Sequence, residues 1–189
     1  MKWYKFELNE FTMKYSDLVL RWRNSSRIRS SMLTNEIISV DRHETWLKKV
    51  LSDDTKIIKI LFYESKPIGL VNFTNIDLVN ETCYWGIYIG EESAPKGSGT
   101  VLGYLALNMI FEEIKIRKVY AEVIEENQIS LNFHKKLGFI EEGRFVNHLK
   151  RGTKYLDVIS MALFNECWNQ RRQQMLTRME EVFDESSFY

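Results

Sequence analysis

A helix near the middle of the chain has to be enclosed by other parts of the protein. The segment after the glycines at positions 97 and 99 is apolar nearly all round, as far as about Ile114. A helix without a polar face is expected to be buried. Its longest apolar stretch, Val101 to Phe111, is about half as long as a membrane crossing needs. We therefore expect a globular core built around this helix.

Sequence patterns on both sides of this helix predict a sheet and its covering helices. Strands are expected before it at 3–11, 56–63, 68–76 and 82–89, and after it at 119–124, 145–149 and 155–164. Helices are expected at 16–33, with a break near Asn24 to Ser26, and at 130–137 and 166–183. A further helix is expected to begin at a capping box formed by Asp41 and Glu44. This order predicts an α/β (α+β) fold with a mixed, mostly antiparallel sheet, one parallel crossover at its middle and flanking helices.

The chain reads as one domain. Its 189 residues include no repeat and no Pro/Gly-rich linker, and this length is typical of a single domain. We assign residues 1–165 to the domain and 166–189 to a C-terminal helical extension of it. Apolar residues in that extension, Trp168, Met175, Met179 and Val182, form a stripe that is expected to pack on the domain or on a second subunit. A homodimer is therefore one expectation.

Composition narrows the classes of partner. Lys plus Arg equals Asp plus Glu at 26 each, so the basic excess typical of nucleic-acid binders is absent. The two cysteines, Cys83 and Cys167, match no zinc spacing, and no metal site is predicted. The start of the chain alternates polar with apolar residues and lacks the apolar run of a signal peptide. We expect a cytoplasmic protein without nucleic-acid or membrane partners.

The junction between a strand and the central helix has the composition of a phosphate site. The strand that ends at Gly90 runs through Ala94-Pro95-Lys96-Gly97-Ser98-Gly99 into the helix. Glycines let main-chain amides approach a ligand closely, and a helix N-terminus carries unpaired N–H groups and a partial charge of roughly +0.5. Together they can hold a pyrophosphate, to which Lys96 adds a charge.

Two other interpretations of this junction compete with the phosphate site. The glycines can simply form a tight turn from strand to helix. The spacing of Gly97, Gly99 and Gly103, with Glu122 further on, also fits a dinucleotide site. A dinucleotide fold opens with this unit and continues with more strand–helix repeats, whereas here four expected strands precede it and a hairpin follows.

The next segment resembles a known family. A strand over 119–124 leads through Asn127 to Ser130 and then to Leu137-Gly138-Phe139, with Glu142-Gly143 after it. With the glycine loop, this arrangement resembles the GNAT superfamily of N-acetyltransferases over about residues 56–164. The resemblance implies a sheet splayed around acetyl-CoA (coenzyme A). It implies cofactor contacts from Ile87, Tyr88, Ile89, Lys96, Gly97, Ser98, Gly99, Thr100, Val101, Asn127, Ser130 and Phe133.

Two positions depart from the family pattern. Ala94 stands where the family loop usually starts with Gln or Arg, so side-chain help to the phosphates is reduced while the main-chain contribution is unaffected. His134 stands where many members have a tyrosine that protonates the departing thiolate. The ordinary imidazole pKa, about 6.5, suits donation to a thiolate, so His134 is the candidate acid, with a packing histidine as the alternative.

The amino-terminal third resembles the acceptor side of sugar-nucleotide N-acetyltransferases, most nearly those of the pseudaminic acid pathway. That resemblance implies a UDP-linked 4-amino-4,6-dideoxy sugar as acceptor. The substrate-binding residues it implies are Arg23, Asn24, Arg29, Met32, His43, Trp46 and Thr74. Arginine suits a diphosphate, and aromatic or methionine faces suit a nucleobase. Alternatively, Trp22, Met32 and Trp46 are helix core residues.

Acetyl transfer to an amine needs a base, a donor to the oxyanion and a way for the thiolate to leave. An unpaired main-chain N–H near Tyr88 or Ile89 is the donor that the family resemblance implies. Glu125, at the end of its strand, is the first candidate for the base, with Glu122 and Glu126 as rivals on the opposite face of the strand. The alternative for all three is a solvated acidic surface.

Other functions remain open at this point. Amino-terminal acetyltransferases of ribosomal proteins and polyamine acetyltransferases share much of the same carboxyl-terminal half. A polyamine site is expected to be rich in acidic side chains, which the arginines of the amino-terminal segment oppose. A non-catalytic acyl-CoA-binding module is the alternative outside enzymes.

Overall fold

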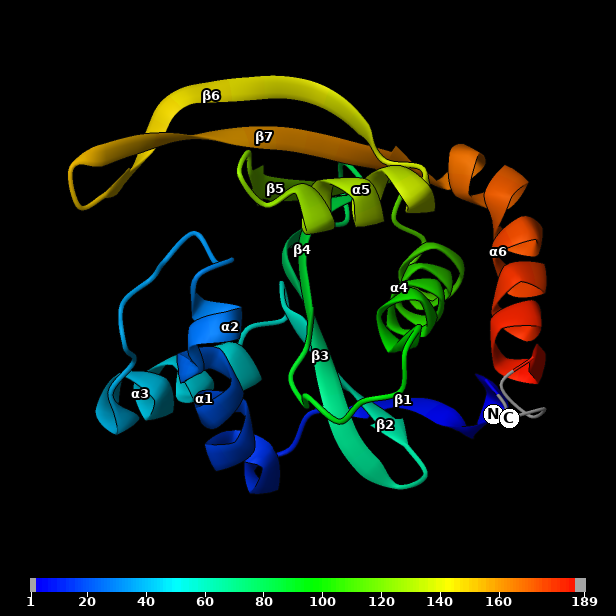
Figure 1. Cartoon of the computed structure of the whole chain (residues 1–189), viewed down its shortest axis with the longest axis horizontal. Coiled ribbons are helices and arrows are strands. Elements are labelled where there is room, and N and C mark those ends of the chain that lie inside the picture. Colours follow the sequence, from blue (N-terminus) through cyan, green and yellow to red (C-terminus); the bar gives the residue numbers. More distant parts are fainter. Residues whose placement is uncertain (1–2, 186–189) are drawn as a thin grey trace.

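The computed structural model describes residues 3–185, in which a seven-stranded sheet is flanked by helices (Figure 1). The strand order is β1-β2-β3-β4-β5-β7-β6. The strands are β1 (Phe6–Glu10), β2 (Ile57–Tyr63), β3 (Lys66–Asp77), β4 (Thr82–Ile89), β5 (Lys118–Ile124), β6 (Ile140–Arg151) and β7 (Lys154–Phe164). The helices are α1 (Ser16–Asn24), α2 (Ser26–Arg29), α3 (Val40–Leu51), α4 (Ser98–Asn108), α5 (Gln128–Leu137) and α6 (Asn165–Glu185).

The sheet is antiparallel except at its middle, as the sequence predicted. β4 and β5 are joined by the crossover through α4 and run parallel, but they pair only at Thr82–Lys118, Cys83–Val119 and Tyr84–Tyr120. The other neighbouring strands pair antiparallel. β4 continues five residues beyond its last paired residue, so the sheet splits into two halves that share a short seam.

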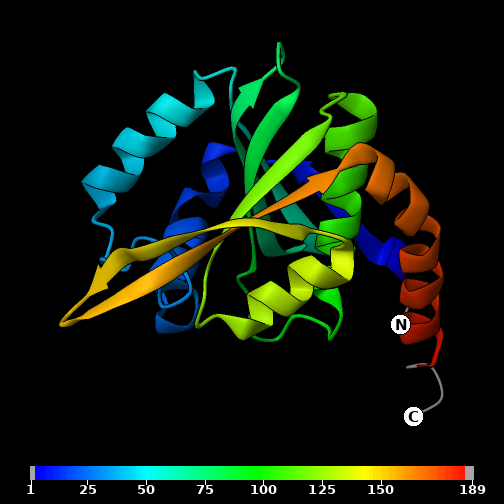
Figure 2. The same cartoon turned by 90° about the horizontal axis from the view of Figure 1, so that it is seen from above.

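The two faces of the sheet carry separate cores. Cys83 and Trp85 of β4 turn their side chains toward α4 and α6, where the larger apolar cluster gathers. The smaller cluster contains Trp22 and Leu47 and lies under α1 and α3. Figure 2 shows α1–α3 on one side of the sheet, and α4 and α6 on the other. We call these sides the cofactor face, which α4 covers, and the acceptor face, which α1–α3 cover.

The central helix is buried as predicted. Val101, Leu102, Ala106 and Leu107 of α4 have no exposed surface. A turn of π-helix at Met109–Glu113 continues the helix. Among the described residues, no helix combines the length and apolar character that a membrane span requires.

Several element boundaries differ from the prediction. A 3-10 turn at Trp3–Lys5 precedes β1, and the helical pattern expected to reach 33 ends at Arg29. The capping box of Asp41 with Glu44 was wrong, because Ser39 is the N-cap of α3 and accepts the N–H of Arg42. Asp41 lies instead within the first turn of the helix, where a negative charge favours the helix dipole.

The last helix packs on its own domain. Trp168, Met175, Met179 and Phe183 are buried in the larger core, and Trp168 Nε1 donates to Asn108 Oδ1 of α4 at 2.9 Å. Val182 was expected in this stripe but is half exposed. The stripe therefore covers the domain, and a homodimer stays a prediction.

Candidate active site

The split in the sheet leaves one edge of β4 without a neighbouring strand. Gly90 N donates to Ile68 O of the adjacent β3 at 2.8 Å. Main-chain groups alternate in direction along a strand, so the N–H groups of Ile87 and Ile89 face away from β3. Beyond Tyr84 they face the gap that opens toward β5. They are candidates for the main-chain donor that the family resemblance implied near Tyr88 or Ile89, and that role stays a prediction.

The glycine loop and the start of α4 lie at the open end of this gap. Gly97 is the N-cap of α4 with φ of 95°, a left-handed conformation that disfavours any residue with a Cβ. The turn is closed by main-chain bonds from Ser98 N to Pro95 O and from Thr100 N to Gly97 O, at 3.1 and 2.9 Å. Within residues 3–185 no side chain caps the helix, and of its first three N–H groups the one of Gly99 makes no hydrogen bond, so it is available to an anion.

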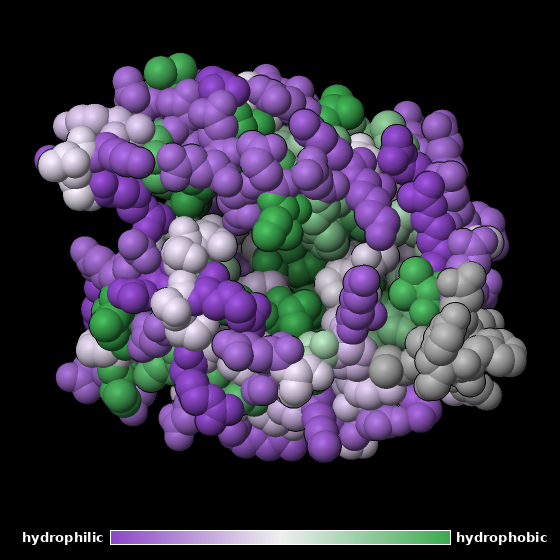
Figure 3. Space-filling view, in the orientation of Figure 1, coloured by the Kyte–Doolittle hydropathy of each residue, from purple (hydrophilic) through white to green (hydrophobic). Residues whose placement is uncertain are grey.

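A cavity of about 500 Å³ lies against this loop. It is lined by Arg27, Ile89, Glu91, Glu92, Ala94, Pro95, Gly97, Ser98 and Gly99. Four of the residues predicted to contact the cofactor, Ile89, Gly97, Ser98 and Gly99, thus share one cavity. Main-chain donors, a helix N-terminus and a glycine with positive φ fit the pyrophosphate of coenzyme A. Figure 3 shows this face of the molecule hollowed beside β4 and beneath α5, with apolar side chains at the floor.

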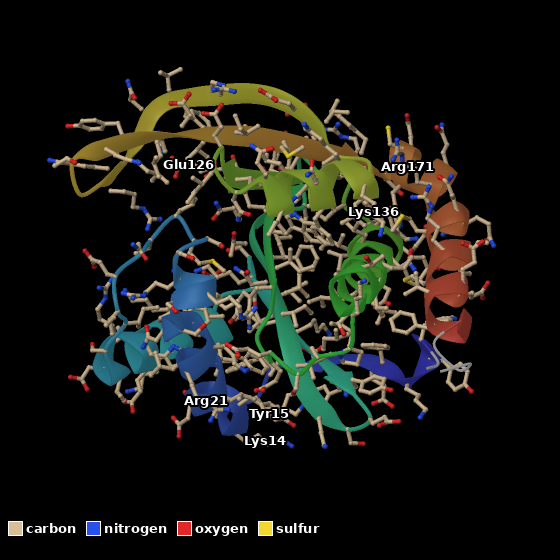
Figure 4. All side chains as sticks on the ribbon, in the orientation of Figure 1. Lys14, Tyr15, Arg21, Glu126, Lys136 and Arg171 are labelled. Carbon is tan, nitrogen blue, oxygen red and sulfur yellow. The ribbon has the colours of Figure 1, made fainter. Side chains whose placement is uncertain are left out.

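Two cations near the loop were not predicted. Arg27 lines the cavity and donates to Ile89 O and Gly90 O at 3.0 and 2.7 Å. Lys136 reaches from α5 toward α4 (Figure 4), where its Nζ donates to Thr100 Oγ1 at 3.3 Å. Lys96, the predicted cation, is exposed and does not line the cavity. Lys136 therefore supplies positive charge beside a loop that has Ala94 where the family has Gln or Arg, whereas the charge of Arg27 is offset by Glu92 at 3.8 Å.

The residues predicted at the start of α5 shape that helix. Asn127 is the N-cap, and its Oδ1 accepts the N–H of Ser130 at 3.1 Å. Phe133 and Leu137 pack over Gly103 of α4, where an added Cβ would lie 3.1 Å from each. These contacts hold α5 against α4, and a direct contact of Asn127, Ser130 or Phe133 with the cofactor stays a prediction.

His134 does not fit the role of general acid. Its side chain is buried, and its Nδ1 donates to Ser130 O at 2.7 Å, while its Nε2 accepts from Trp85 Nε1 at 3.2 Å. Burial lowers the pKa of His134 to about 4. In this neutral imidazole the one proton, on Nδ1, is held by Ser130 O, and Nε2 is an acceptor, so neither nitrogen has a proton available for the thiolate at neutral pH. The assignment of His134 as the acid was wrong, and the alternative of a packing histidine holds.

The three candidate carboxylates have different surroundings. Glu125 lies just after β5 and forms an ion pair with Arg144 at 2.6 Å, and Arg144 also binds Asp157 at 3.0 Å. Glu126 is exposed. Glu122 is partly buried, and among the residues that the structure describes its carboxylate has no hydrogen bond or ion pair. Of the three, Glu122 has the carboxylate that is free to accept a proton.

Glu122 lies at the point where the sheet opens. It is two residues beyond Tyr120, the last residue of β5 that pairs with β4. Tyr120 stacks on Tyr84 with ring centroids 5.0 Å apart, and the negative charge of Glu122 contributes to the raised pKa of Tyr84 after the larger effect of burial. By alternation, Glu122 shares the acceptor face with Tyr84 and Tyr88.

Tyr88 is enclosed on the acceptor face. Its ring meets Trp22 edge to face with centroids 6.4 Å apart. Burial raises the pKa of Tyr88, against the opposing effect of the Arg23 charge, so the hydroxyl stays protonated at neutral pH. Trp22 itself is a core residue, because it packs so closely on Gly90 that an added Cβ would lie 2.1 Å from its ring.

Some of the predicted acceptor residues serve the fold. The Asn24 amide both donates to Ile38 O and accepts from Ile38 N, at 2.9 and 2.8 Å. His43 is buried, its Nε2 lies 3.0 Å from Ser16 O, and burial lowers its pKa. The assignments of Asn24 and His43 to the substrate are therefore corrected, because their polar groups are engaged within the protein.

The remaining acceptor residues lie in three places. Thr74 is partly buried on β3 opposite Tyr84. Trp46 stacks on His43 and lines a second cavity of about 400 Å³, formed by α3 alone. Arg23 and Arg29 are partly buried and donate to Thr34 O and Asn35 O at 2.8 and 3.3 Å, close to Met32. Of these residues, Arg23 has a charge that acts on Tyr88, and Arg29 lies close enough to interact with Arg23.

Comparison with known proteins shows which family and which relatives this chain is similar to. The profile of the acetyltransferase (GNAT) domain matches residues 5–140. The acetyltransferase PseH of Campylobacter jejuni (strain 81-176) is 28% identical over 130 residues, 69% of this chain and 80% of that protein. The spermidine N(1)-acetyltransferase of Vibrio cholerae is 26% identical over 151 residues, 79% of this chain and 87% of that protein.

Solved structures show the same fold. The crystal structure of spermidine N-acetyltransferase from Vibrio cholerae, in complex with CoA and spermine, matches with a TM-score of 0.82 and 23% identity. The match covers 88% of this chain and 99% of that one. The predicted splayed sheet and its flanking helices are thereby confirmed, and so is acetyl-CoA as the cofactor.

Proposed function

Because the chain belongs to the GNAT acetyltransferase family and is an acetyl-CoA-dependent N-acetyltransferase, we propose that it acetylates the amine of an amino-sugar nucleotide. The acceptor that fits best is a UDP-linked 4-amino-4,6-dideoxy sugar, as in the pseudaminic acid pathway. Transfer is direct, with both substrates bound in the gap between the halves of the sheet.

The observation that carries this proposal is the charge of the acceptor face. Arg23 and Arg29 lie there partly buried, and among the described residues neither makes an ion pair with a carboxylate. A nucleotide diphosphate supplies the negative charge that such guanidinium groups bind well. A polyamine is a polycation, and these arginines would repel it.

The chain's own residues support two steps. Acetyl-CoA, when bound, supplies a thioester carbonyl that an amine can attack. Glu122, free and at the opening of the sheet, takes the proton that the sugar ammonium must lose. The N–H groups of Ile87 and Ile89 face the gap and can donate to the oxyanion of the tetrahedral intermediate, each worth about 3 kcal/mol when its geometry is good.

A polyamine acceptor is the second candidate. The observation in its favour is that spermidine acetyltransferases are about as similar in sequence as PseH and share the fold over most of the chain. Those proteins are named for spermidine, whereas PseH is named only as an acetyltransferase. Overall similarity therefore does not choose between the two acceptors, whereas the local charge of the acceptor face supports the sugar nucleotide.

A thiol-release assay tests the proposal. Purified protein with acetyl-CoA is given a UDP-4-amino-4,6-dideoxy sugar, spermidine or a peptide with a free amino terminus, each at the same concentration. We expect release with the amino-sugar nucleotide at least tenfold faster than with the others. Faster release with spermidine would contradict the sugar assignment, and release with none of the three would contradict all of these acceptors.

A further inference from the structure

Three arginines from three elements converge on four successive main-chain carbonyls. Arg23 of α1 donates to Thr34 O and Arg29, at the end of α2, donates to Asn35 O. Arg151, the last residue of β6, donates to Met32 O and to Leu33 O, the latter at 3.2 Å. Figure 1 shows the segment between α2 and α3 rising toward the hairpin of β6 and β7. Residues 32–35 have no helix or strand of their own.

The three guanidinium groups are close enough to repel one another. Burial lowers the pKa of Arg23, and the positive charges of Arg151 and Arg29 lower it further, while Tyr88 acts in the opposite direction. Within residues 3–185, no carboxylate forms an ion pair with any of the three. Glu36, which directly follows the four carbonyl residues in sequence, is paired with Arg42 at 3.1 Å.

Two donors in this cluster have no partner among the described residues. Arg23 Nη1 and Arg29 Nε are closed off from solvent and make no hydrogen bond within residues 3–185. A buried donor without a partner costs about 1–3 kcal/mol, and more when it is charged. Carbonyl oxygens are neutral, so they compensate three positive charges only weakly. An anion with several oxygens would pair both the charges and the unused donors.

We propose that Arg151 completes a three-arginine site for the diphosphate of the acceptor, and that the carbonyls of residues 32–35 occupy this site until the diphosphate displaces them. This inference rests on the proposed function and names the group by which that acceptor is held. Arg151 belongs to the β5–β7–β6 half of the sheet, whereas Arg23 and Arg29 lie over the other half. A bound diphosphate therefore links the two halves across the gap.

Binding of UDP, measured by calorimetry on the protein saturated with coenzyme A, tests the site. Coenzyme A fills the glycine loop, so UDP cannot bind there through its own phosphates. We expect UDP to bind the wild type, to bind Arg151→Gln at least tenfold more weakly, and to bind Arg151→Lys with an intermediate loss. Lys150→Gln is the matched control, because Lys150 is exposed on the same hairpin and on the opposite face of β6. Its UDP affinity should equal that of the wild type.

Uridine and pyrophosphate separate the nucleoside from the diphosphate. Pyrophosphate should compete with UDP in the wild type, and uridine affinity should be the same in Arg151→Gln and the wild type. Equal UDP affinity in Arg151→Gln and the wild type, or absence of UDP binding to the wild type, would overturn the proposed site. Equal losses for uridine and UDP would overturn the role of the diphosphate.

Hydrogen exchange on the wild type tests the displacement without a variant. UDP added to the coenzyme A-saturated protein should change the exchange rate of amides in residues 31–39. An unchanged exchange rate in this segment would overturn the proposed displacement of its carbonyls. An unchanged KM for acetyl-CoA and an unchanged unfolding temperature show that Arg151→Gln is folded. If Arg151→Gln does not fold, Arg151→Lys is used for the same measurement. UDP binding without acetylation of any amino-sugar nucleotide would leave this site standing while the proposed function fails.

Discussion

The cofactor site and the acceptor face are built in different ways. The cavity expected to hold the cofactor is formed mainly by one nearly continuous stretch from Ile89 to Gly99, which includes the N-terminus of α4. The acceptor site that we propose depends on side chains such as Arg23, Glu122 and Arg151, which come from elements far apart in the sequence.

This difference explains how relatives of one family can carry different substrate names. Main-chain donors persist through many substitutions, because a change of side chain leaves the N–H group in place. Ala94, which stands where the family usually has Gln or Arg, is such a change. A site of side chains changes its charge with a single substitution. PseH and spermidine acetyltransferases, both similar to this chain over most of its length, are consistent with a constant cofactor half and a variable acceptor half.

The largest expected effect comes from the acceptor face. Glu122→Gln removes the free carboxylate at the opening of the sheet, and we expect kcat to fall by about 100-fold or more, as for loss of a general base. Acetyl-CoA affinity, set by the other half, should not change. The matched control is Glu125→Gln, whose wild-type carboxylate is tied to Arg144; it should lower kcat less than fivefold. The reverse ranking in steady-state kinetics would restore Glu125 as the base.

A second, smaller effect concerns a residue that belongs to neither site. The pKa of His134 is about 4 in the folded protein and about 6.5 when unfolded, so between these values the unfolded chain binds more protons. Stability is therefore retained above pH 6.5 and lost as the pH falls toward 4, by about 2 kcal/mol at pH 5.

Urea unfolding at pH 7 and pH 5 measures that loss. His134→Asn should be less stable than the wild type at pH 7. Its free energy of unfolding should also differ less between pH 7 and pH 5 than that of the wild type. His148→Asn is the control, because His148 is exposed, and its difference should match that of the wild type. A difference of wild-type size in His134→Asn would mean that other groups cause the acid sensitivity.

The smallest expected effect is on the cofactor half. Gly97→Ala places a Cβ in a left-handed conformation and 3.1 Å from the ring of Phe183, at about 1–2 kcal/mol of strain. We expect roughly tenfold weaker acetyl-CoA binding by calorimetry, since the loop shifts. Gly152→Ala also has positive φ but meets nothing within 4 Å, so it controls for backbone strain alone. Equal acetyl-CoA affinity in Gly97→Ala and Gly152→Ala would show that Gly97 has no specific role in cofactor binding.

The sequence predicted features that depend on residues close together in the chain and missed those that depend on residues far apart. The central crossover, the buried helix and the glycine loop were predicted because each depends on neighbouring residues. Arg27, Lys136 and Arg151 were missed, since nothing local marks a cation that reaches a loop or a distant segment. His134 was misassigned because the pattern gives its place on the helix but not the Trp85 indole that meets it. Ser39 was missed as an N-cap because Asp41 offered an equally good local signal two residues later.

The contact of Phe183 with Gly97 has a consequence for synthesis of the protein. The loop that holds the cofactor emerges from the ribosome with α4, but the aromatic ring that packs against it arrives only with the last turns of α6. A nascent chain that has completed all seven strands still lacks this support. Coenzyme A should therefore bind firmly only to chains whose α6 has been translated and docked, so cofactor capture is coupled to a late step of folding.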